Sequence, residues 1–246
     1  MNTKIKSTRS LKAIARERLL GNYNVAIVTY LIMQFIISGI LDIVERHSNT
    51  SGFGLFIYYA VYIVLTLLTG VFTVGQYWIY RMILRNTKPN ISVMWSGFKH
   101  HPDKAIRINL YLIILVAICG IPLYASLLLY VFTKEMIILP LVALCMILFM
   151  GLALYFSLQY SQALFLLIDY PDESPKELLQ HSKEMMKGHK LQLLYLNLSF
   201  IGVLLLVLCT FGLGMLWAYP YMTATKTMFY EELFAKEPLN SINITI

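Results

Sequence analysis

The chain has 246 residues, of which 58% are hydrophobic and only 13% are charged, and its mean hydropathy is +0.66. A soluble domain usually carries about 25% charged residues, so this composition excludes a soluble globule. The net charge of +7 is typical of basic loops on one side of a membrane, and we expect no nucleic-acid partner. The three cysteines lie inside apolar runs at no zinc-binding spacing, so no metal or other cofactor is expected.

The apolar runs predict an all-α, polytopic membrane protein, because about 20 apolar residues in a helix cross the hydrocarbon core. The last run would be about 60 Å long as one helix, so the glycine-containing segment 210–214 is expected to turn. We therefore predict one integral membrane domain over 1–246 with six transmembrane helices, paired as three hairpins. An interfacial helix is expected over 7–21, and the spans over about 23–44, 54–80, 107–131, 137–168, 191–209 and 214–231.

Basic residues alternate between rich and poor segments along the chain. The N-terminal leader and the second and fourth loops are rich in Lys and Arg, whereas the first, third and fifth loops hold Arg46, Lys134 and none. This alternation follows the positive-inside rule, so both termini are predicted to be cytoplasmic. The basic residues of the leader are Lys4, Lys6, Arg9, Lys12, Arg16 and Arg18.

Three amphipathic segments precede the hairpins on the predicted cytoplasmic side. The first is the basic helix at 7–21, whose apolar face is expected to meet lipid. The second runs from Ile91 to Arg107 and is less regular. In the third, Ser174 and Glu177 form a capping-box pattern around a proline, and Gly188 is a natural stop. The apolar positions of the first helix are Leu11, Ile14, Ala15 and Leu19.

Four stretches spread over nearly the whole chain carry a resemblance to a known family. They are LKAIARERLLGNY, DYPDESPKELLQHSKEMMKGHK, LSFIGVLLL and LWAYPYMTATKTMFYEEL. With these stretches the chain resembles the bacterial integral-membrane family known as domain of unknown function 975. The family pattern often carries Pro-Gly where this chain has Met150-Gly151. The resemblance implies a bacterial plasma membrane protein and no particular chemistry.

No catalytic site is expected from the polar residues. His181 and Glu184 lie one helical turn apart with His189 beyond them, but this spacing matches no zinc motif. A solvated polar face explains them better. Asp169 and the acids that follow it could bind a divalent ion or a lipid headgroup. Capping of the next helix is the favoured interpretation.

Polar side chains within the spans offer a candidate cavity. Gln34 and Ser38 share a face of the first span, Thr73 and Gln76 share a face of the second, and Ser157 lies in the fourth. These residues could line a site for a small molecule, but close helix packing explains them as well. Trp217, Tyr219 and Tyr221 surround Pro220, where they could line an acyl-chain groove or pack in the core.

The basic leader favours a lipid ligand. Each Lys or Arg near an anionic leaflet contributes about 1 kcal/mol, so Lys12, Arg16 and Arg18 are candidate contacts to anionic inner-leaflet lipids. We expect a non-enzymatic membrane protein that binds lipid or a membrane protein partner as an accessory or envelope protein. The alternative is a permease for a small neutral or apolar solute.

Overall fold

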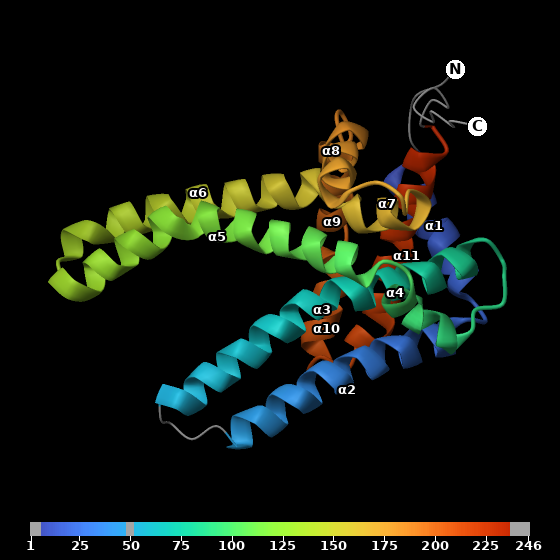
Figure 1. Ribbon diagram of the computed structural model, residues 1–246. Helices are drawn as coiled ribbons and strands as arrows, with labels where there is room; N and C mark the ends of the chain where they lie inside the picture. The colour runs from blue at the N-terminus through green and yellow to red at the C-terminus, as the bar shows by residue number, and fades with distance from the viewer. Residues whose placement is uncertain (1–5, 48–51, 237–246) are drawn as a thin grey trace.

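The computed structural model describes residues 6–47 and 52–236, and within these ranges it is helical without β-strands (Figure 1). Lys4 of the basic leader, residues 48–51 of the first predicted outer loop and the terminal residues 237–246 lie outside the described ranges. The elements in chain order are α1 (Thr8–Leu19), α2 (Tyr23–His47), α3 (Gly52–Leu84), the 3-10 turn η1 (Ile91–Trp95), α4 (Ser96–Lys99), α5 (Pro102–Thr133), the 3-10 turn η2 (Met136–Ile138), α6 (Leu139–Gln159), α7 (Ala163–Asp169), α8 (Pro175–Met185), α9 (Lys190–Leu198), α10 (Ile201–Cys209) and α11 (Met215–Phe234).

Among the described residues, five helical stretches are long and apolar enough to cross a membrane. They confirm the prediction of an all-helical, multi-pass membrane protein. The sixth predicted span is present as helix α11 but is not one of the five. The α-helix of the fourth stretch is interrupted between α6 and α7, and that of the fifth between α9 and α10. The five stretches are Tyr23–His47, Gly52–Leu84, Pro102–Thr133, Met136–Asp169 and Lys190–Cys209.

Buried side chains gather at one end of the molecule. There α1, α3, α7, α8 and α11 pack together around three apolar clusters. From this packed base, the α2–α3 and α5–α6 pairs extend as two long arms that diverge from one another (Figure 1). The outer parts of the arms expose large apolar side chains such as Phe35, Phe56 and Ile147. Such surfaces are suited to lipid, in which they need no protein cover.

Helix α1 corrects one expectation from the sequence. Its apolar residues Leu11, Ala15 and Leu19 are fully buried, and the helix packs along α11 and against α3. The prediction that this face meets lipid is therefore wrong, because α11 presents a complementary apolar surface that includes Phe229. An ion pair between Lys6 and Glu232 joins the start of α1 to the same helix.

The second amphipathic segment packs closely against α3. A Cβ atom on Gly75 would overlap the backbone carbonyl of Met94 in η1, and one on Gly97 in α4 would overlap the carbonyl of Val71. The two glycines thus allow backbone to meet backbone. This contact fixes η1 and α4 on the C-terminal half of α3.

The third amphipathic segment begins as the sequence predicts. The Ser174 side chain accepts from the Glu177 N–H, and the Glu177 carboxylate accepts from the Ser174 N–H, which confirms the capping box. Gly188 has a φ of +85° and follows the helix end, as expected of a stop. Leu178, Ser182 and Met186 are fully buried or nearly so, so this face of α8 also packs on protein.

Candidate functional site

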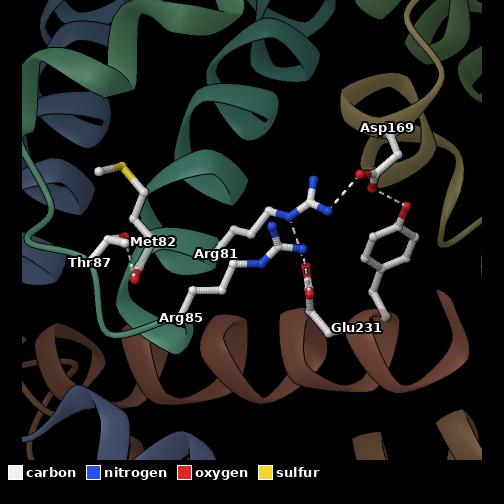
Figure 2. A network of polar contacts seen from close by, with 7 residues as sticks. Arg81, Met82, Arg85, Thr87, Asp169 and Glu231 are labelled. Atoms are coloured by element: carbon white, nitrogen blue, oxygen red, sulfur yellow. Dashed lines mark hydrogen bonds and ion pairs between the residues drawn. The ribbon is translucent and has the colours of Figure 1, made fainter. Parts of the chain in front are cut away.

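A network of charged side chains lies where three parts of the chain meet (Figure 2). Arg81 of α3 donates through Nη2 to Asp169 Oδ1 at 2.5 Å, and its Nε lies 2.9 Å from Glu231 Oε1 of α11. One helical turn further along α3, Arg85 Nη2 donates to Glu231 Oε2 at 2.9 Å. The Tyr230 hydroxyl donates to Asp169 Oδ2 at 2.5 Å. We call these five residues the ionic junction.

The ionic junction is largely shielded from solvent. The side chains of Arg81, Asp169 and Glu231 are 9%, 12% and 18% exposed, whereas Arg85 is half exposed. Two positive and two negative groups face one another, so the formal charge of the set cancels. Buried charges that pair and hydrogen-bond in this way avoid most of the cost of burial. The junction therefore ties α3, α7 and α11 together, and the contact between Arg81 Nε and Glu231 Oε1 is an ion pair without hydrogen-bond geometry.

The candidate cavity residues lie on different arms of the structure. Gln34 and Ser38 are exposed on α2, and the Ser38 hydroxyl donates to the Gln34 carbonyl. Thr73 is half-buried on α3 and donates to the Thr69 carbonyl at 2.7 Å. Ser157 is exposed on α6, where it lines a small apolar cavity of about 200 Å³ between α5 and α6. Ser157 therefore lies on the α5–α6 arm, whereas Gln34, Ser38 and Thr73 lie on the α2–α3 arm.

Gln76 is the most buried member of the candidate set, with 1% exposure. Its Oε1 accepts a hydrogen bond of 2.6 Å from the Tyr219 hydroxyl, and the Tyr219 ring stacks on Tyr30 with centroids 4.3 Å apart. The Gln76 Nε2 atom has no hydrogen-bond partner among the described residues. Buried polar atoms without a partner are uncommon in proteins, so this atom is a candidate for contact with a polar group.

The three basic candidates on α1 have different surroundings. Lys12 turns inward, where Nζ donates to the Ser199 carbonyl at 2.7 Å and lies 4.3 Å above the Phe200 ring. Burial lowers the pKa of Lys12 from its ordinary value. Arg18 is half-buried, and Arg16 is exposed and lines a groove.

This groove has a volume of about 370 Å³ and lies between α1, the start of α2, α10 and α11. Its polar residues include Arg16, Tyr23 and Tyr221, and its apolar walls include Val207 and Trp217. The sequence singled out Arg16 as a contact to anionic lipid and, separately, Trp217 and Tyr221 around Pro220, and the structure brings all three to one site. We call it the α10–α11 groove.

The histidines and acids of the fourth loop do not form a metal centre. Among the residues that the structure describes, no group of three or more His, Cys, Asp or Glu could hold a metal ion. His181 Nδ1 lies 3.4 Å from Glu173 Oε2, and its ring packs against Tyr170. Lys104 donates to the carbonyls of Pro171 and Glu173 and holds this loop on α5. These contacts fix the loop on the packed base.

Sequence reasoning missed the ionic junction. The sequence analysis favoured a capping role for Asp169 and the acids that follow it, and it gave Glu231 and Tyr230 no role. One signal was available in the sequence. Arg81, Asp169 and Glu231 each lie near the end of an apolar segment, and charged residues in such positions usually pair with one another.

The fold and the apolar surface define a multi-pass α-helical membrane protein, held together at one end by paired charges. The family model described as a protein of unknown function, DUF975, matches residues 1–237, so the chain belongs to that family. No curated protein and no solved structure matches the chain.

Proposed function

We propose that the chain is a six-span protein of the bacterial plasma membrane, built of three hairpins with both termini in the cytoplasm. The alternation of basic residues supports this topology. Helix α11 would supply the sixth span, with the turn at Thr210–Gly214 on the outer side. Phe211 in this turn is 99% exposed.

The proposed function is non-enzymatic binding of anionic inner-leaflet lipid or of a membrane protein partner, as an accessory or envelope protein. The observation that carries the lipid proposal is the exposed basic surface of α1. Burial of Leu11, Ala15 and Leu19 seats the helix on α11, while Arg9 and Arg16 stay exposed and Arg18 is half-buried. Cations held on such a helix attract anionic headgroups.

The ionic junction supports the absence of catalysis. Its carboxylates already bind arginine, and a general acid or base must be able to exchange a proton with substrate. The junction supplies shape rather than chemistry in this proposal.

The test is extraction of the protein in native nanodiscs, followed by mass spectrometry of the lipids and proteins that accompany it. We expect enrichment of anionic lipid over the bulk membrane. The variant Arg9→Gln/Arg18→Gln should lower that enrichment roughly five-fold for each charge, since each contributes about 1 kcal/mol. The matched control Arg46→Gln/Lys134→Gln removes two exposed charges at the proposed outer side and should leave it unchanged. A stoichiometric protein would favour the partner proposal. Bulk lipid alone, with no protein, would contradict both.

A permease for a small neutral or apolar solute is the second candidate, and the buried Gln76 favours it. Its unpartnered Nε2 atom could bind a polar group of a solute. Uptake or efflux in proteoliposomes that Gln76→Leu abolishes would support this function. Loss of flux in Gln34→Leu, at an exposed position of α2, would support it as well. Proteoliposomes without solute-specific flux would contradict the permease.

A further inference from the structure

The α10–α11 groove has the size and lining of a site for one acyl chain. Its volume of about 370 Å³ falls at the lower end of the range of about 300–1,000 Å³ that is typical of small-molecule sites. Val203 and Val207 of α10 form one wall, and Trp217 and Ala218 of α11 form the other. Along α10 the lining runs from Val203 to Thr210 just past the helix end, so the groove extends roughly 10 Å along this helix.

The groove is open at the side rather than enclosed. Leu206 is 66% exposed and Trp217 is 57% exposed, and both line it. These side chains belong to the hairpin that we place in the membrane. A lipid chain can therefore enter from the bilayer without passing through water.

The lining of the groove carries a positive charge. Arg16 of α1 lines it together with Tyr23 and Tyr221. Within residues 6–47 and 52–236, no carboxylate forms an ion pair with Arg16, in contrast to Arg81 and Arg85. A guanidinium beside an apolar groove is suited to a carboxylate or phosphate that carries an apolar tail.

We propose that the α10–α11 groove binds an anionic amphiphile. One acyl chain lies between α10 and α11, and the carboxylate or phosphate headgroup binds Arg16 and the hydroxyls of Tyr23 and Tyr221. This inference rests on the proposed lipid-binding function and adds to it a defined site and ligand class. The shared chemistry of an anionic head on a long chain fits either a free fatty acid or an anionic phospholipid.

Trp217 provides a direct readout, because it lines the groove and the chain has only two other tryptophans. The variant Trp78→Phe/Trp95→Phe leaves Trp217 as the single fluorophore. In nanodiscs of neutral phosphatidylcholine, it is titrated with brominated fatty acid, brominated phosphatidylglycerol or brominated phosphatidylcholine. Bromine quenches tryptophan only at close range, so quenching reports occupancy of the groove.

We expect saturable quenching by an anionic probe at a low mole fraction, whereas brominated phosphatidylcholine should quench only in proportion to its mole fraction. The probe that saturates first identifies the source of the headgroup. Arg16→Gln should weaken the apparent affinity roughly tenfold or more, because a charge-assisted contact is lost. Arg46→Gln, which removes an exposed charge at the C-terminal end of α2 outside the groove lining, should not. Val207→Phe fills the groove, keeps Arg16 and should abolish saturation.

Quenching that is linear for all three probes, or saturable quenching that survives both Arg16→Gln and Val207→Phe, would overturn the proposal. Elution as a single species and an unchanged helical circular dichroism spectrum control for folding of each variant. If the Arg9→Gln/Arg18→Gln variant still lowers lipid enrichment while Trp217 shows no saturation, the groove fails and the broader lipid-binding function stands. If the unaltered protein shows no anionic enrichment either, the broader function fails as well.

Discussion

Removal of one carboxylate from the ionic junction should destabilise the protein more than removal of any exposed carboxylate. The Asp169 carboxylate accepts a hydrogen bond of 2.5 Å from Arg81. In Asp169→Asn the side chain keeps its shape but loses its negative charge. A hydrogen bond to a charged group contributes about 1.5–3 kcal/mol. An uncompensated buried charge costs about 3–5 kcal/mol, but Glu231 still pairs with Arg81. We therefore expect a loss of about 2–3 kcal/mol.

The assay is reversible unfolding in mixed micelles with increasing sodium dodecyl sulfate. The matched control is Asp103→Asn, which breaks an exposed pair with Arg107 at 3.9 Å. Exposed pairs contribute about 0–1 kcal/mol, so this control should stay close to the unaltered protein. The double variant Arg81→Gln/Asp169→Asn measures the coupling, which should be about 1–3 kcal/mol for residues in contact. Equal losses in Asp169→Asn and Asp103→Asn, or zero coupling, would refute the assignment of a stabilising junction.

Three further predictions concern the packed base. Gly75→Ala should destabilise the protein by about 1–3 kcal/mol, because the added Cβ meets the Met94 carbonyl. The control Gly151→Ala places its Cβ in open space and should change the same unfolding transition by less than about 1 kcal/mol. Equal effects would contradict the close packing of η1 on α3. Ser174→Ala should cost about 1 kcal/mol through loss of the cap, and Ser174→Asp should restore most of it; identical transitions for the two variants would count against the capping box. Burial and the charge of Lys236 lower the pKa of His189. Its stabilising contribution is therefore complete above the ordinary pKa of about 6.5 and is lost as the pH falls through the lowered value, so His189→Gln should flatten the decline in stability between pH 7 and pH 5. A decline of unchanged slope would show that His189 is not its source.

Local features of this chain follow from nearby residues and could be predicted. The capping box at Ser174, the stop at Gly188 and the turn at 210–214 need only short-range sequence. In the turn, Gly212 has a φ of +89°, which explains why glycine stands there. The apolar stretches likewise determine helix positions, although the helices continue past the predicted spans at several ends, as α3 does to Leu84.

Long-range contacts could not be predicted in the same way. Asp169 is 88 positions from Arg81, and their pairing depends on how α3 and α7 pack. The face of α1 was recognised as apolar, but periodicity cannot distinguish a face that meets lipid from one that meets another helix. The groove could not be predicted for the same reason. Arg16 and Trp217 were each singled out from the sequence, but they come together only because α1 packs against α11.

The proposed topology places α1 on the cytoplasmic side of the membrane and the turn at 210–214 on the outer side. The most direct test replaces Cys119, Cys145 and Cys209 with alanine and adds a single exposed cysteine as Glu17→Cys in α1 or Phe211→Cys in the turn. Each variant is treated with a membrane-impermeant maleimide in intact spheroplasts and again after lysis. We predict that Phe211→Cys reacts in intact spheroplasts and Glu17→Cys only after lysis. Reaction of Glu17→Cys in intact spheroplasts, or of Phe211→Cys only after lysis, would contradict the account.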